Sequence, residues 1–262
     1  MPILQEKSIT QKLLNYELKI MKNSIVITGA AQRIGLFLTD FFLKKEYSVI
    51  AVVRKDSNEL SELKKQYPLQ LIIDYKDFLI DSIDIDFWEK YKNYQIGGFI
   101  HCASVFKYDN IITSTKQSQL EHEKVNCDTF VDGCVSYMKT NILEQLSCIA
   151  FLDAKVEKLN PDHFSYTLSK LKLKSAIEFL SMTGANKLRV NAISPGLTLP
   201  SGNQTNKDFK RVKSKLPLKV TPSLVEIANL ALFLIETKSI TNQNIVIDGG
   251  QNLISNQDII FQ

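Results

Sequence analysis

Tyr166 and Lys170 form a Tyr-x-x-x-Lys pattern. On a helix this spacing places both side chains on one face, one turn apart. A tyrosine phenol has an ordinary pKa of about 10, too high for ready titration at neutral pH. A nearby lysine ammonium favours the phenolate and lowers that pKa, which suits the pair to acid–base catalysis. The same spacing also occurs by chance on exposed helix faces, so other residues must support a catalytic interpretation.

A second chemical feature is the turn at residues 28–35, with the sequence TGAAQRIG. Its small residues permit a tight turn, and a following helix would direct free N–H groups at a diphosphate. The spacing is TGxxxRxG and not GxGxxG, so alone it indicates only a turn that needs glycine. The candidate cofactor contacts here are Thr28, Gly29, Arg33, Ile34 and Gly35.

The end of the second strand-like segment bears on the choice of cofactor. Arg54 lies where an enzyme that uses NAD usually has Asp or Glu for the ribose 2′-hydroxyl. An arginine suits a 2′-phosphate instead. Arg33 and Arg54 are therefore predicted to clamp that phosphate, with Ser57 as a hydroxyl donor. A solvated surface pair of Arg54 with Lys55 is the alternative.

These residues resemble the short-chain dehydrogenase/reductase family, whose usual turn is TGxxxGxG. Arg33 stands at the middle glycine, a variant similar to that of pteridine reductases and dihydromonapterin reductases. Asn126 precedes Tyr166 by 40 residues, as in the family. The segments 191–196 (NAISPG) and 246–250 (VIDGG) also follow the family pattern in order and spacing. The resemblance covers the chain from residue 24 to about residue 253.

The resemblance implies roles for particular residues. Lys170 would also hold the nicotinamide ribose, and Asn126 would support a water-linked proton path to Tyr166. Asp74 matches a family acid that contacts the adenine ring, although a simple strand-end turn residue is the alternative. The remaining cofactor contacts implied are Ala103, Ser104, Pro195, Gly196 and Thr198, together with Tyr166 and Lys170.

Two departures from the family pattern bear on the substrate. Asp153 stands thirteen residues before Tyr166, where the family usually has serine. A serine hydroxyl suits a ketone oxygen, whereas a carboxyl suits a ring nitrogen that must be protonated. Ser104 replaces the last glycine of the family's Asn-Asn-Ala-Gly, and Phe106 follows two residues later. This pattern is similar to that of pteridine reductases, in which the aromatic ring at the matching position covers the pterin. The substrate contacts predicted are Phe106, Asp153, Tyr166 and Leu199.

Both departures have simpler alternatives. Asp153 could mark a degraded site or a strand-end turn, and Phe106 could pack in the base of its loop. His101 and Cys102 also depart from the Asn-Asn pattern, and we interpret them as buried strand-end residues.

Alternating strands and helices must position these side chains. Short runs of Ile, Val, Leu and Phe indicate strands that are covered on both faces. Strands are predicted at 24–28, 47–53, 69–73, 97–102, 146–152, 188–193 and 244–248, and helices near 33–45, 83–94, 116–140, 164–184 and 223–236. With the resemblance, this order predicts an α/β fold, a single doubly wound Rossmann-type parallel sheet of about seven strands in the order 3-2-1-4-5-6-7 with helices on both faces. Residues 200–215 are expected to form the longest mobile loop.

The chain is expected to divide into an N-terminal extension, residues 1–22, and a single NADP-binding catalytic domain, residues 23–262. Met21 precedes the first strand-like segment and looks like a natural start for this fold. Met1–Ile20 is therefore expected to take no part in catalysis, with a packed amphipathic N-terminal helix as the alternative.

Composition excludes several other classes. The net charge is +4, from 32 basic and 28 acidic residues that are scattered, which gives no case for a nucleic-acid or membrane surface. The four cysteines form no CxxC pair and only three histidines accompany them, so no metal site is expected. Reduced thiols of a cytoplasmic protein are the expected state. No secretory signal is visible, and no apolar run reaches the roughly 18–20 residues of a spanning helix.

The expected function is NADPH-dependent reduction of a dihydropterin, such as dihydromonapterin or dihydrobiopterin, to the tetrahydropterin, within tetrahydrobiopterin or folate metabolism. A carbonyl reductase of the same family, acting on a 3-oxoacyl thioester or another ketone, is one alternative, and Asp153 counts against it. A non-catalytic nucleotide-binding protein is another, and the presence of Tyr166 and Lys170 counts against that. The resemblance also implies a homotetramer, formed through the helices near 116–140 and 164–184.

Overall fold

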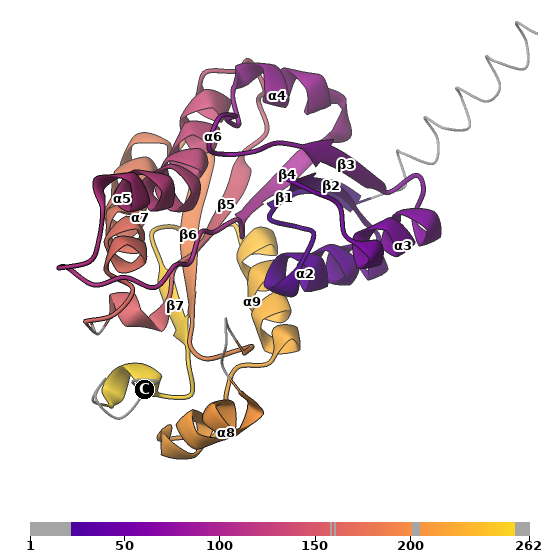
Figure 1. Cartoon of the computed structure of the whole chain (residues 1–262). Helices are drawn as coiled ribbons and strands as arrows, with labels where there is room; N and C mark the ends of the chain where they lie inside the picture. The colour runs from indigo at the N-terminus through magenta and orange to yellow at the C-terminus, as the bar shows by residue number, and fades with distance from the viewer. Residues whose placement is uncertain (1–21, 158, 160, 201–204, 255–262) are drawn as a thin grey trace, which may run out of the picture.

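A single parallel sheet organises the chain (Figure 1). The computed structural model describes residues 22–157, 159, 161–200 and 205–254, so nearly all of the predicted extension at 1–22 lies outside the described residues. Seven strands lie in the order β3-β2-β1-β4-β5-β6-β7, which confirms the predicted fold and strand order. The strands are β1 (Lys22–Thr28), β2 (Tyr47–Val53), β3 (Leu71–Tyr75), β4 (Ile96–His101), β5 (Leu146–Phe151), β6 (Leu188–Pro195) and β7 (Asn244–Ile247).

Helices cover both faces of the sheet because successive strand residues point to opposite sides. In β1, Val26 joins the core on one face, while Ile25 and Ile27 join the core on the other. The first face carries α4 (Ile85–Tyr91), α5 (Lys116–Glu123), α6 (Thr129–Met138) and α7 (Phe164–Thr183); the second carries α2 (Arg33–Lys44), α3 (Asn58–Gln66) and α9 (Leu224–Glu236). This two-sided burial explains why the strands are nearly continuous apolar runs.

Helix α3 was not predicted from the sequence. Its composition is polar, and Leu60 is its only buried residue. The helix begins at a cap, in which the Ser57 hydroxyl accepts a hydrogen bond from the Leu60 N–H. The capping residue was therefore the available signal, because hydrophobic periodicity was too weak to reveal the helix.

The expectation of a long loop at 200–215 was wrong for most of that segment. Residues Asn206–Lys215 form helix α8. The Thr205 side chain accepts from the Asp208 N–H, and the Asp208 carboxylate accepts from the Thr205 N–H, which makes a capping box. This reciprocal pair satisfies two backbone donors and explains why a lysine-rich segment becomes helical.

The four cysteines are free thiols, and Cys127, Cys134 and Cys148 are buried in the core. Within the described part of the chain, no helix is both long and apolar enough to cross a membrane. The same residues contain no group of three or more His, Cys, Asp or Glu side chains arranged to hold a metal ion.

Candidate active site

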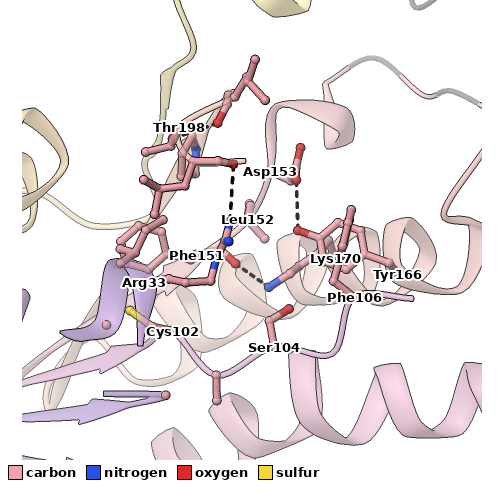
Figure 2. Close-up of a pocket in the computed structure, with 18 of the residues that line it drawn as sticks. Arg33, Cys102, Ser104, Phe106, Phe151, Leu152, Asp153, Tyr166, Lys170 and Thr198 are labelled. Atoms are coloured by element: carbon pink, nitrogen blue, oxygen red, sulfur yellow. Dashed lines mark hydrogen bonds between the residues drawn. The ribbon is translucent and has the colours of Figure 1, made fainter. Parts of the chain in front are cut away.

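A cavity of about 520 Å³ lies at the carboxyl ends of the strands, where open α/β sheets bind ligands. It is lined by the turn after β1, the segments after β4, β5 and β6, and one face of α7. Figure 2 shows Asp153, Tyr166 and Lys170 in this cavity. The predicted site residues that it brings together are Gly29, Arg33, Ile34, Gly35, Ala103, Ser104, Phe106, Asp153, Tyr166, Lys170, Pro195, Gly196, Thr198 and Leu199.

The turn after β1 leaves no room for side chains at its two glycines. A Cβ on Gly29 would lie 2.7 Å from the backbone nitrogen of Ala103, and Gly29 itself has a φ of +67°. A Cβ on Gly35 would lie 2.2 Å from the carbonyl oxygen of Gly29. Helix α2 begins here with no side-chain cap and no acidic residue in its first turn. Its free N–H groups therefore suit an anion.

Arg33 stands at the family's usual glycine with a φ of 54°, a left-handed conformation that costs a non-glycine residue roughly 1–2 kcal/mol. Its guanidinium donates hydrogen bonds to the carbonyl oxygens of Pro200 at 2.8 Å and Leu199 at 3.5 Å. Arg33 therefore ties the turn after β1 to the segment after β6. Arg54 is exposed just after β2 and does not line the cavity, so the clamp of both arginines on a phosphate stays a prediction.

A buried histidine joins the turn to the long helix. The His101 ring contacts the Thr28 hydroxyl through Nδ1 at 2.8 Å and the Val125 carbonyl through Nε2 at 3.0 Å. Because a carbonyl only accepts, Nε2 carries the proton and Nδ1 accepts from Thr28. The Thr28 hydroxyl in turn accepts from the Ala103 N–H at 3.2 Å. Burial, helped by the charge of Lys170, lowers the pKa of His101 to about 3, so the ring is neutral.

The predicted helix near 116–140 contains a π-turn at Lys124–Asp128, between α5 and α6. The Thr129 N–H bonds to the carbonyl of Lys124, five residues back. In an α-helix it would bond to Val125, whose carbonyl accepts from His101 instead. Such turns are frequent at functional sites.

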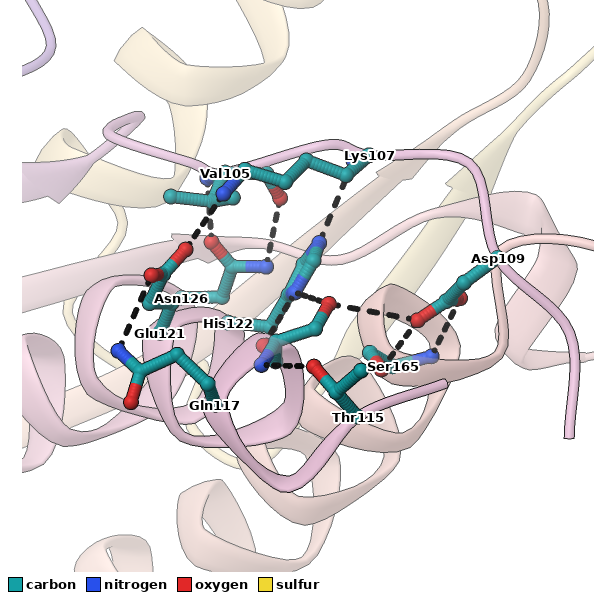
Figure 3. A network of polar contacts seen from close by, with 10 residues as sticks. Val105, Lys107, Asp109, Thr115, Gln117, Glu121, His122, Asn126 and Ser165 are labelled. Atoms are coloured by element: carbon teal, nitrogen blue, oxygen red, sulfur yellow. Dashed lines mark hydrogen bonds and ion pairs between the residues drawn. The ribbon is translucent and has the colours of Figure 1, made fainter. Parts of the chain in front are cut away.

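Asn126 lies in this π-turn and is fully buried. Its amide oxygen accepts from the Val105 N–H at 2.7 Å, and its amide nitrogen donates to the Val105 carbonyl at 3.0 Å (Figure 3). The same amide nitrogen donates to the Ser169 hydroxyl at 3.0 Å. Asn126 does not line the cavity. Its side chain therefore holds the segment after β4 against α7, and the proton path expected of it stays a prediction.

Tyr166 and Asp153 are in direct contact. The Tyr166 hydroxyl donates to Oδ2 of Asp153 at 3.0 Å. Burial, then the negative charge and hydrogen bond of Asp153, raise the pKa of Tyr166 well above its ordinary value. We expected a lowered pKa from Lys170, and that expectation was wrong in direction, because the carboxylate is the nearer charge and the phenol is buried.

Lys170 lies behind the tyrosine and is only 2% exposed. Its Nζ donates to the Phe151 carbonyl at 2.7 Å and lies 5.7 Å from the centroid of the Tyr166 ring. Burial lowers the pKa of Lys170 to about 8, although the charge of Asp153 acts in the opposite direction. The ammonium therefore keeps its charge at neutral pH and loses its proton as the pH rises through about 8.

Four predicted cofactor residues lie outside the cavity: Thr28, Arg54, Ser57 and Asp74. The Asp74 carboxylate accepts from the Tyr91 hydroxyl at 2.6 Å and from Lys90 at 2.9 Å. Partial burial would raise the pKa of Asp74, but these two bonds outweigh it and hold the pKa below its usual value. Contact of Asp74 with an adenine ring stays a prediction.

Sequence reasoning missed several residues that line the cavity: Gln32, Cys102, Phe151, Leu152, Asp162, His163, Leu197 and Gln251. The Gln251 side chain accepts from the Leu197 N–H at 2.8 Å, and Gln251 directly follows the VIDGG segment, which was the available signal. Cys102 lines the cavity as a thiol whose pKa is raised by burial.

Comparison with known proteins identifies the class. Residues 29–252 match a family model described as Enoyl-(Acyl carrier protein) reductase, which covers most of the chain. The chain therefore belongs to the short-chain dehydrogenase/reductase family and is an oxidoreductase of that family.

Particular members of the family resemble this chain over most of its length. A dihydromonapterin reductase of Citrobacter koseri is 26% identical over 240 residues, which are 87% of this chain and 96% of that protein. The 3-oxoacyl-(acyl-carrier-protein) reductase FabG of Buchnera aphidicola is 28% identical over 243 residues, 89% of this chain and 98% of that protein. The structure of FolM alternative dihydrofolate reductase 1 from Brucella suis in complex with NADP has a TM-score of 0.83 and 30% identity, covering 89% of this chain and 96% of that one.

Proposed function

We propose that this chain is an NADPH-dependent reductase that converts a dihydropterin to the tetrahydropterin. The observation that carries the proposal is the hydrogen bond of 3.0 Å from Tyr166 to Asp153, in a cavity that Phe106 also lines. The similarity to dihydromonapterin reductases and to a FolM structure with NADP supports the same assignment.

The cavity fits a dinucleotide. Gly29 and Gly35 keep the turn after β1 free of side chains, and the start of α2 offers N–H groups without a competing carboxylate. Arg33 and Arg54 would hold the 2′-phosphate, and Lys170 would hold the nicotinamide ribose. When bound, NADPH supplies the hydride for the reduction.

Reduction of a ring C=N bond also requires a proton on the nitrogen. Tyr166 remains a phenol at neutral pH because its pKa is raised, so its hydroxyl can donate that proton. Asp153 accepts the hydrogen bond from Tyr166 and is half-buried, so it can pass a replacement proton from solvent to the phenolate. Phe106 offers a flat apolar ring for a heteroaromatic substrate to stack on.

Reduction of a 3-oxoacyl thioester is the second candidate, favoured by the 28% identity to FabG of Buchnera aphidicola. Reduction of a ketone is favoured by a hydroxyl that donates a hydrogen bond to the ketone oxygen. Asp153 replaces the serine that would provide one, and as a carboxylate beside Tyr166 it opposes the negative charge that builds on a ketone oxygen. This candidate therefore leaves Asp153 unexplained.

The purified enzyme should oxidise NADPH with dihydromonapterin, dihydrobiopterin or dihydrofolate. Simple ketones and acetoacetyl thioesters should give much lower kcat/KM values, measured from the loss of NADPH absorbance under identical conditions. Turnover of the ketones or thioesters together with none of the pterins would refute the assignment and leave the family membership intact.

The enzyme should prefer NADPH to NADH, because Arg54 stands where an acidic residue would bind the 2′-hydroxyl. Arg54→Asp should erode this preference, since it removes a phosphate partner and adds a repulsive charge. The measurement is kcat/KM for each cofactor, and Lys55→Asp is the matched control for charge at the same strand end. Equal use of both cofactors by the unaltered enzyme would contradict the assignment of Arg54.

A further inference from the structure

His163 lies three residues before Tyr166, immediately before α7, and lines the cavity. Its backbone is left-handed, with a φ of 55°. Its side chain is only 14% exposed, and Nδ1 lies 3.3 Å from a carboxylate oxygen of Asp162. Neither the family resemblance nor the proposed proton transfer assigns a role to the His163 ring.

The ring of His163 is stacked on Phe106. The two rings are nearly parallel, at 16°, with centroids 4.2 Å apart. Phe106 also meets the Tyr166 ring edge-on, with centroids 4.7 Å apart. His163 thus covers one side of Phe106 and restricts where that ring can lie relative to the catalytic tyrosine.

The backbones that carry these rings are fastened to each other. His163 occupies the N-cap position of α7 but provides no side-chain cap. Asp109, from the segment that carries Phe106, accepts from the Ser165 N–H at 3.0 Å and from the Ser165 hydroxyl at 2.5 Å (Figure 3). A long-range cap therefore replaces the local one, and it fixes the Phe106 segment to the start of α7.

Resting on the proposed function, we propose that His163 is a specificity-determining residue: His163 and Phe106 form a two-ring wall that selects flat heteroaromatic substrates. Phe106 provides the surface on which the substrate stacks, and the stacked His163 ring, which also lines the cavity, holds that surface in position. An open-chain ketone gains nothing from such a surface, so the wall contributes to selectivity between substrate classes.

Two substitutions at one position separate the ring from the backbone. Asn tolerates the left-handed conformation, so His163→Asn removes the ring and preserves the turn. His163→Phe keeps an aromatic ring for stacking. We expect His163→Asn to raise the KM for dihydropterin about fivefold with kcat nearly unchanged, because stacking binds the ground state and the transition state alike. His163→Phe should restore a KM within about twofold of the wild-type value.

The matched control is Tyr108→Ala. Tyr108 meets the His163 ring edge-on at 5.5 Å, but it is 74% exposed and does not line the cavity. Its removal takes an aromatic ring from the same loop and should change the KM for dihydropterin less than twofold. Phe106→Ala, which removes the stacking surface itself, should raise that KM at least as much as His163→Asn.

All four variants are assayed as NADPH-saturated enzyme, and binding of oxidised pterin is measured in parallel by fluorescence quenching. If the wild type reduces pterins and His163→Asn keeps the wild-type KM and pterin affinity, the two-ring wall is refuted while the proposed function stands. If the KM rises equally in His163→Asn and His163→Phe, the ring is not the cause and the inference is also overturned. A wild-type enzyme that neither reduces nor binds pterins would overturn both proposals.

Discussion

Tyr166→Phe should lower kcat for dihydropterin reduction by roughly a hundredfold to ten-thousandfold, the contribution typical of a positioned proton donor. The substitution removes only the hydroxyl that donates to Asp153, and it keeps the ring that packs against Phe106. NADPH affinity, measured by fluorescence titration, should therefore change less than about twofold. Near-normal turnover of Tyr166→Phe would show that the proton comes from another group.

Lys170→Ala provides the comparison, because it should weaken both turnover and NADPH binding. The pH profile of the wild type carries a related expectation. Burial lowers the pKa of Lys170 to about 8, so its positive charge is complete below that pH and is lost above it. Tyr166, with its raised pKa, remains a phenol over the same range. The rate of pterin reduction should therefore be steady below about pH 8 and fall above it, through loss of the lysine charge.

Asp153→Ala should lower kcat/KM for dihydropterin at least roughly tenfold, equivalent to about 1.4 kcal/mol of transition-state stabilisation. The variant removes the acceptor of the Tyr166 hydroxyl and the group that can relay a proton from solvent. Asp153→Ser restores the usual family residue and serves as the matched variant. It should fail to recover pterin reduction, while it raises the ratio of ketone to pterin turnover. Unchanged kcat/KM in Asp153→Ala would exclude the carboxyl from catalysis.

Asp153→Asn tests the electrostatic part of the same arrangement. The negative charge of Asp153 raises the pKa values of both Tyr166 and Lys170. Removing that charge lowers both pKa values, so each group loses its proton at a lower pH. The alkaline decline of kcat should therefore move to lower pH in Asp153→Asn, and a shift to higher pH would contradict the geometry described for the site.

The sheet, and the placement of Tyr166 and Lys170 side by side in one cavity, could be predicted because their signals are local in sequence. Tyr166 and Lys170 are separated by one helical turn, and the strands are short apolar runs whose burial on both faces removes polar alternation. The importance of Gly29 and Gly35 could also be predicted, because the backbone around each position leaves room only for glycine. Helices α3 and α8 were missed because their capping residues, and not apolar periodicity, mark where they begin.

The pKa shifts in the site and the stack of His163 on Phe106 could not be predicted from the sequence. The pKa of Tyr166 depends on how deeply the phenol is buried and on which charge lies nearest, and the pattern of residues encodes neither. The stack of His163 on Phe106 joins two loops that are 57 residues apart, and no spacing rule relates them. Such contacts follow from how the ends of β4 and β5 lie side by side in the sheet.

Because of the π-turn at Lys124–Asp128, the direction in which the side chains of this helix point depends more on the number of residues in the turn than on their types. Each residue of a helix advances the chain by about 100° around the axis, so loss of one residue here would restore regular α-helical bonding and rotate one flank relative to the other. Asn126 would then lose its hydrogen bond with Val105, and the Val125 carbonyl would lose its hydrogen bond with His101, without any change of residue type. Single-residue deletions should therefore be tolerated less well in this segment during evolution than most substitutions on its exposed side. When homologous chains are aligned, gaps belong outside residues 124–128, even where the amphipathic pattern would accept them.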